Sequence, residues 1–102
     1  ITYRAQIEEG NQTSDDGIIR PEIYLTTDNS SYTAVARGQE GLSGTIRAEY
    51  GASATVSLIF DVTNTSTHKC KFAITSLAAN DRLLGASSAM FTSFMFIKLG
   101  DT

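Results

Sequence analysis

The chain has 102 residues, of which 41% are hydrophobic and 19% are charged, and its formal net charge is −3 at neutral pH. This length predicts a single domain over residues 1–102 with one hydrophobic core. The negative charge argues against nucleic acid or an anionic membrane surface as a partner. Apolar runs such as residues 58–60 and 94–97 are far shorter than the ~20 residues of a membrane-spanning helix.

The first eight residues alternate apolar and polar side chains, the pattern of a β-strand with one buried face. One face of this strand is expected to carry Ile1, Tyr3, Ala5 and Ile7, and the other Thr2, Arg4, Gln6 and Glu8. The polar segment at residues 11–17 ends in Asp-Gly, which indicates a loop.

Three further strands are predicted before the middle of the chain. Pro21 is expected to precede a strand at residues 22–27, because proline cannot donate a hydrogen bond to a ladder. A third strand is predicted over residues 32–37. The glycines of residues 38–41 then indicate a turn into a strand at residues 43–50.

The clearest alternation covers residues 54–63, and its predicted inward row is Val56, Leu58, Phe60 and Val62. A polar turn connects this strand to a second one at residues 68–76, with Cys70, Phe72 and Ile74 inward, so the two predict a β-hairpin. If Phe60 belongs to the core, Phe60→Ala is expected to cost about 3–5 kcal/mol.

The end of the chain combines a loop and an apolar strand. Residues 76–88 predict a loop with one short strand or helical turn. Residues 89–99 predict a last strand with two apolar faces, which needs a covering layer on both sides. In a chain this short, another subunit is the natural source of the second layer. The residues assigned to the core and the subunit interface are Phe91, Phe94, Met95, Phe96, Ile97 and Leu99.

These elements together predict an all-β fold, an antiparallel β-sandwich or jelly roll of about seven to eight strands. Ser and Thr supply 24 of the 102 residues, a bias that suits β-rich surfaces. The single cysteine excludes a disulfide within the chain.

No pattern in the sequence indicates catalysis, a metal or a cofactor. His68 and Cys70 share a strand face as a thiol and an imidazole would in a nucleophilic site, but Cys70 continues an apolar row and is expected as a buried thiol. The acidic residues lack the spacing of a calcium loop. Lys69 and Lys71 are expected on a solvated face, paired with carboxylates of a neighbouring strand.

The alternating pair of segments at 54–76 and the ending Phe-Met-Phe-Ile-Lys-Leu-Gly-Asp at 94–101 resemble the C-terminal β-domains of tailed-phage structural proteins. Their order is also similar to jelly-roll heads of the tumour necrosis factor and complement globular-head type. The resemblance implies a bacteriophage virion surface protein, such as a fibre head or a capsid decoration protein. It further implies a homotrimer in contact with other virion proteins and with a host-surface glycan.

The sequence therefore supports two functional hypotheses. The first is a non-enzymatic structural virion protein that forms a homotrimer through apolar strand faces. The alternative is a carbohydrate-binding β-sandwich that recognises a receptor through its loops. The loop residues assigned to glycan contact are Asp15, Asp16, Asn29 and Tyr32.

Overall fold

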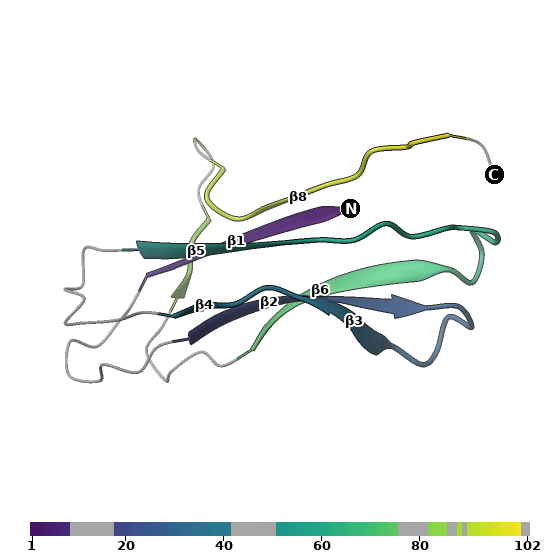
Figure 1. The fold of residues 1–102 in the computed structure, drawn as a ribbon, viewed down its shortest axis with the longest axis horizontal. Helices are drawn as coiled ribbons and strands as arrows, with labels where there is room; N and C mark the ends of the chain where they lie inside the picture. The colour runs from purple at the N-terminus through teal and green to yellow at the C-terminus, as the bar shows by residue number, and fades with distance from the viewer. Residues whose placement is uncertain (9–17, 42–50, 76–81, 86–87, 89, 101–102) are drawn as a thin grey trace.

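The structure is a computed structural model in which two layers of β-strands pack face to face (Figure 1). Every regular element in the described part of the chain is a strand, and every strand pair is antiparallel. The predicted all-β sandwich is therefore confirmed. The residues that the structure describes are 1–8, 18–41, 51–75, 82–85, 88 and 90–100.

The first sheet is built around β1 (Thr2–Glu8). One edge of β1 pairs with β5 (Gly51–Ser57). The other edge is shared by β8 (Ser93–Met95), opposite the start of β1, and β7 (Arg82–Leu83), opposite its end. The N-terminal strand is thus the middle strand of its sheet, held by partners from the second half of the chain.

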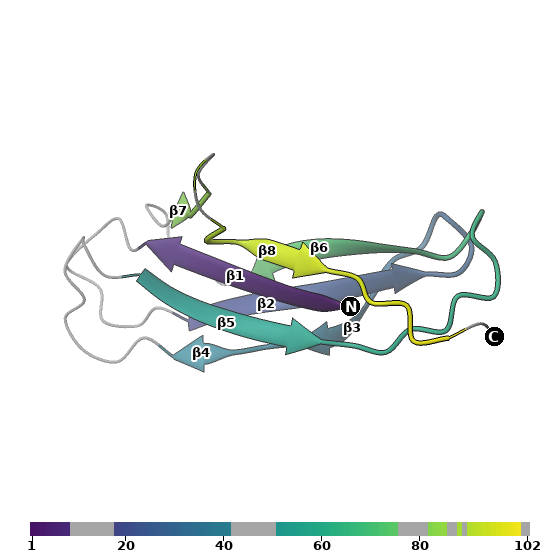
Figure 2. The same ribbon diagram turned by 90° about the horizontal axis from the view of Figure 1, so that it is seen from above.

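The second sheet is built around β2 (Ile18–Thr26). Its partner on one edge is β6 (Lys69–Thr75), and on the other edge β3 (Thr33–Arg37) and β4 (Glu40–Gly41) pair one after the other. Figures 1 and 2 together show β1 lying over β2 and β8 on the β6 side. Each sheet is three strands wide.

The longer strands are fewer than the seven to eight predicted. Within the described residues six strands have three or more residues, and β4 and β7 are two-residue pairings. The alternating pattern also overestimated lengths, since β8 covers Ser93–Met95 rather than residues 89–99. β7 lies in the segment predicted as a loop with one short strand. The strand predicted at residues 43–50 lies outside the described residues.

The core lies between the two sheets and follows the alternation of β1 and β2. The even positions Thr2, Arg4 and Gln6 point outward with the polar side chains of β5. Partly buried residues of β6, including Cys70, Phe72 and Ile74, complete the core as predicted. The buried apolar residues are Tyr3, Ala5, Ile7, Ile19, Ile23, Ala54 and Val56.

The predicted hairpin between the strands at 54–63 and 68–76 is wrong. β5 pairs with β1, whereas β6 pairs with β2, so residues 58–68 cross from one sheet to the other. Two alternating strands joined by a polar turn look the same in sequence whether they lie side by side or face each other across a core. β5 also ends at Ser57, so Phe60 and Val62 of the predicted inward row lie beyond the strand, where Phe60 is half-buried and Val62 is 41% exposed.

Pro21 lies inside β2 rather than before it, and this position has a local explanation. The carbonyl of Pro21 accepts a hydrogen bond from the Gly38 amide, in the interval between β3 and β4. In an antiparallel strand the amide and carbonyl of one residue point to the same side. The nitrogen of Pro21, which has no hydrogen to donate, therefore faces the point where the neighbouring strand is interrupted. A sheet tolerates proline at an irregularity of this kind.

Candidate functional site

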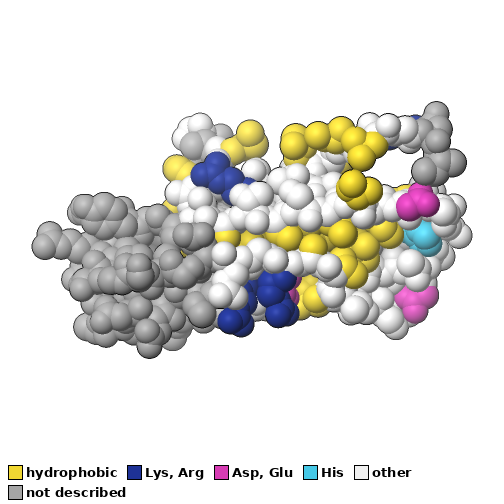
Figure 3. Space-filling view, viewed as in Figure 1, with side chains coloured by type: hydrophobic (Ala, Val, Ile, Leu, Met, Phe, Trp, Pro, Cys, Tyr) yellow, Lys and Arg dark blue, Asp and Glu magenta, His cyan; other side chains and the backbone are white. Residues whose placement is uncertain are grey.

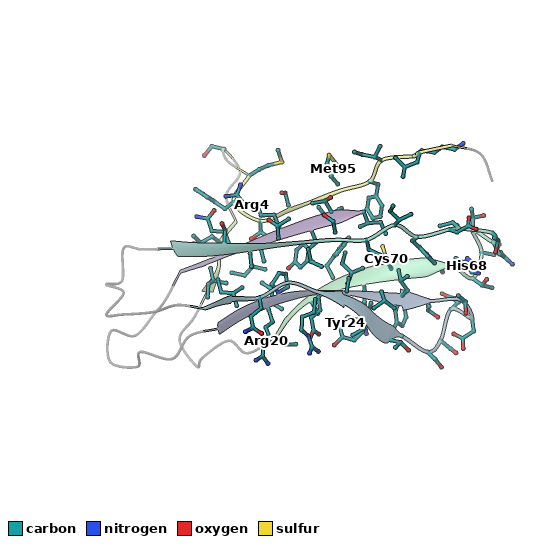
Figure 4. All side chains as sticks on the ribbon, in the orientation of Figure 1. Arg4, Arg20, Tyr24, His68, Cys70 and Met95 are labelled. Atoms are coloured by element: carbon teal, nitrogen blue, oxygen red, sulfur yellow. The ribbon has the colours of Figure 1, made fainter. Side chains whose placement is uncertain are left out.

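The C-terminal segment, defined here as residues 94–99, presents its apolar side chains on two faces. Phe94 is opposite Tyr3 in the register of β8 and β1, and paired residues project to the same side of a sheet. Because Tyr3 is buried in the core, Phe94 faces the second sheet. Met95 is opposite Thr2 and faces outward, and Figure 4 shows its side chain pointing away from the body of the molecule.

The inward face of the C-terminal segment joins an aromatic cluster that bridges the two sheets. Phe72 of β6 stacks on Phe94 with ring centroids 4.9 Å apart, and it lies 4.9 Å from Tyr3 and 6.0 Å from Phe96. Phe94 and Phe96 also meet edge to face at 5.9 Å. The cluster closes the side of the sandwich between β8 and β6.

Despite these contacts the C-terminal segment remains largely open to solvent in the single chain. Its five large apolar side chains are between 52% and 77% exposed. Figure 3 shows them as hydrophobic surface along the upper right of the molecule, standing off the rest of the chain. Phe91, the remaining residue assigned to this interface, is half-buried.

The turn between β2 and β3 contains two of the four residues assigned to glycan contact. Asn29 is exposed and has a left-handed backbone conformation, with φ of 62°, and Tyr32 is half-buried. Asp15 and Asp16 lie outside the described residues. The structure therefore places only half of this predicted site.

Asp28 organises the same turn, a role that the sequence analysis did not assign. One of its carboxylate oxygens accepts hydrogen bonds from the backbone amides of Ser30 and Ser31, both at 2.8 Å, and from the Thr26 hydroxyl at 2.7 Å. The bonds from Ser31 and Ser30 are the main reason that the pKa of Asp28 lies well below its ordinary value. The signal in the sequence was an Asp followed by small polar residues, which form such turns.

A carboxylate on the outer face of the second sheet is covered by its neighbours. Glu22 accepts a hydrogen bond from the Tyr24 hydroxyl at 2.6 Å, and its other oxygen forms an ion pair with Arg37. The tyrosine bond, followed by Arg37, lowers the pKa of Glu22, and the same bond raises the pKa of Tyr24. The charge of Glu22 is thus compensated within the sheet.

Lys71 of β6 occupies the next position on this face. It is opposite Tyr24 in the β2–β6 register, and its ammonium lies 5.0 Å from the centre of the Tyr24 ring and 4.6 Å from that of Tyr32. The sequence predicted that Lys71 pairs with a carboxylate of a neighbouring strand. This prediction is wrong, because among the described residues the Lys71 ammonium contacts tyrosine rings instead of a carboxylate.

His68 and Cys70 have different surroundings in the structure. Cys70 packs against the core, and Figure 4 shows it between the layers. Burial raises the pKa of its thiol, which disfavours the nucleophilic thiolate. His68 lies over the Phe60 ring, with centroids 5.7 Å apart, and its Nδ1 accepts a hydrogen bond from the Thr63 amide at 3.3 Å.

No group of three or more histidine, cysteine or acidic side chains in the described part of the chain is arranged to hold a metal ion. No helix within that part is long and apolar enough to span a membrane.

Comparison with known proteins adds no relative: no family model matches the chain, and neither a curated protein nor a solved structure matches it. The candidate functional surfaces are therefore the exposed C-terminal segment and the outer face of the second sheet.

Proposed function

We propose that this chain is a non-enzymatic structural domain that assembles with copies of itself through the C-terminal segment, as a component of a virion surface. The observation that carries the proposal is the exposure of five large apolar side chains within residues 94–99. A concentration of apolar surface of this kind is typical of an interaction site.

The backbone of this segment also favours association. β8 pairs with β1 over only three residues, and among the described residues its opposite edge has no strand partner. An open strand edge with apolar side chains is a template for pairing with another chain. Burying Met95, Ile97 and Leu99 against a second copy would add a hydrophobic contribution to that pairing.

The virion placement and the threefold order rest on the resemblance to tailed-phage structural proteins. A fibre head or a capsid decoration protein needs a stable scaffold, a polar exterior and an apolar subunit interface. The outer face of the first sheet, with Thr2, Arg4 and Thr55 in register, fits the polar exterior. We place the protein on the outside of the particle, where it contacts other virion proteins.

The assembly is tested by measuring the absolute mass of the protein by light scattering after size exclusion. We expect a particle of about 33 kDa, three times the chain mass of 11.0 kDa. The combined variant Met95→Ser, Ile97→Thr, Leu99→Ser should yield folded monomer. The control Ile59→Thr, which removes an exposed apolar residue outside the C-terminal segment, should leave the particle intact.

A monomeric wild-type protein at all concentrations would contradict self-assembly. An assembly that survives the combined variant would show that another surface holds it. The virion placement is tested separately, by searching for peptides of this chain in virus particles purified from the source that encodes it. Particles that lack the chain would contradict the placement and leave the assembly result standing.

A further inference from the structure

We infer that the outer face of the second sheet binds an acidic polysaccharide, with Lys71 receiving its carboxylate or sulfate group. The binding surface consists of Tyr24, Tyr32, Lys69 and Lys71. This inference is independent of the assembly proposed above, because it concerns the opposite sheet from the C-terminal segment.

The geometry of this surface comes from three strands. Tyr24 and Lys71 are directly opposite each other on β2 and β6, and Thr26 and Lys69 form the next outward pair along the same strands. Tyr32 comes from the turn that leads into β3. The hydrogen bond from the Tyr24 hydroxyl to Glu22 fixes the ring on which the Lys71 ammonium rests.

The electrostatics of this surface favour an anion, although the chain as a whole is acidic. Of the two nearby carboxylates, Glu22 is buried and its charge is compensated by Arg37, whereas Asp28 keeps its charge but is held by hydrogen bonds within its own turn. Neither Lys69 nor Lys71 forms an ion pair with a carboxylate of the described residues. Lys71 is exposed and keeps ammonium hydrogens for an incoming acid group.

The chemistry of the surface favours an acidic sugar over a nucleic acid. The acid group of a sugar needs one or two exposed cations, which Lys71 and Lys69 supply. Single-stranded nucleic acid binds by stacking its bases on open aromatic faces inside a basic groove. Here both rings already carry the Lys71 ammonium, which leaves them closed to a base, whereas an acid group of a sugar can contact the ammonium without displacing it.

The test uses the intrinsic fluorescence of the protein, because the chain contains four tyrosines and no tryptophan. Polygalacturonate, heparin, neutral dextran and a single-stranded oligonucleotide are titrated separately at physiological salt. We expect binding of at least one of the two acidic polysaccharides, and the pair distinguishes carboxylate from sulfate. Dextran and the oligonucleotide should not bind.

Matched variants locate the site. Lys71→Ala should weaken binding of the acidic polysaccharide by at least about tenfold, the effect of losing one hydrogen bond to a charged group. Lys71→Arg should stay within about threefold of wild type, since it keeps the cation over the rings. The control Arg4→Ala removes an exposed cation from the outer face of the first sheet and should leave affinity unchanged.

Thermal unfolding of each variant establishes that it is folded. Lys71→Arg is expected to retain the wild-type melting temperature, whereas Lys71→Ala should remain folded with a slightly lower one, because it loses the contacts with the Tyr24 and Tyr32 rings. The inference is overturned if neither acidic polysaccharide binds, if the oligonucleotide binds more tightly than both, or if Arg4→Ala weakens binding as much as Lys71→Ala.

Discussion

Asp28 shows how a single side chain orders a connection at the end of a strand. Its carboxylate replaces the strand partners that the amides of Ser30 and Ser31 would otherwise need, and it also holds the Thr26 hydroxyl. The left-handed conformation of Asn29 in the middle of this turn suits a residue type that tolerates it. This ordered turn also leads into Tyr32 and so positions its ring beside Lys71.

The depressed pKa of Asp28 makes its contribution to stability dependent on pH. A carboxylate whose pKa is lower in the folded state stabilises the fold above its unfolded pKa, here near 3.8, and loses that effect as the pH falls below this value. The stability difference between wild type and Asp28→Ala should therefore be constant from about pH 7 to about pH 5 and shrink toward about pH 2. Urea unfolding at several pH values measures it.

Asp28→Asn is the comparison for this experiment. Its amide oxygen still accepts hydrogen bonds but does not titrate, so its difference from Asp28→Ala should not vary over the same range. A gap between wild type and Asp28→Ala that stays constant down to about pH 2 would contradict the role of the charged carboxylate.

Gly38 occupies a position where a side chain has no room. A Cβ at this residue would lie 2.7 Å from the carbonyl oxygen of Thr55 and 3.2 Å from Cγ of Pro21. Gly38→Ala should therefore destabilise the protein by about 1–3 kcal/mol, because the backbone of β5 must shift. Gly85→Ala, where nothing lies within 4 Å, should change stability by less than about 0.5 kcal/mol.

Chemical denaturation compares these two glycine variants directly. Equal effects would mean that β5 does not approach Gly38 as closely as the structure has it. The sign of the Gly85→Ala change is informative as well, since an unstrained alanine restricts the unfolded chain and stabilises slightly.

At the scale of elements, the aromatic cluster around Phe72 connects the sheets on the β8–β6 side. Phe72 reaches Tyr3, Phe94 and Phe96, whereas Phe60 lies in the connection at residues 58–68 and stacks on His68. The cluster therefore joins residues of three strands, and the Phe60 pair joins two residues of one connection.

This difference predicts an order of stability effects. Phe72→Ala should cost about 2–3 kcal/mol and Phe60→Ala about 1–2 kcal/mol, both below the value for a fully buried phenylalanine. Urea unfolding at low protein concentration measures both without a contribution from association. A larger loss for Phe60→Ala would restore the inward row predicted from sequence and contradict the end of β5 at Ser57.

The faces of individual strands could be predicted from the sequence, but their partners could not. Alternation correctly placed Tyr3, Ala5 and Ile7 on one strand face, which the structure buries in the core, because side chains alternate between the two sides of a strand. Pairing depends on residues far apart in the chain, so β5 was assigned to β6 instead of β1. The prediction for Lys71 was wrong for the same reason, since its environment comes from the β2–β6 register.

At the scale of the whole molecule, the two candidate surfaces differ in how much of each could be predicted from the sequence. The C-terminal segment was visible as a run of apolar residues, and the register added which of them face inward. The surface around Lys71 combines β2, β6 and the turn before β3, segments that only the folded chain brings together. Its residues carry no motif that marks them in the sequence.

The two surfaces lie on different sheets of the sandwich (Figures 1 and 4). Association through β8 of the first sheet therefore leaves the outer face of the second sheet free for a ligand. Several copies held together would each present Lys71, and a polymeric glycan could contact more than one of them at once. Linked sites of this kind gain affinity without any new contact.

The central place of β1 has a consequence for folding. This first strand of the sequence is completed by β8, and the Gln6 amide reaches the Thr92 hydroxyl across 86 positions of the chain. The buried side chains of β1 pack against residues of β2, β5 and β6, so its apolar side is covered only when strands far along the chain have folded onto it. Folds that depend on such distant pairing form slowly and are prone to aggregate beforehand. We therefore expect the denatured chain to refold slowly and to lose yield by aggregation as the protein concentration rises.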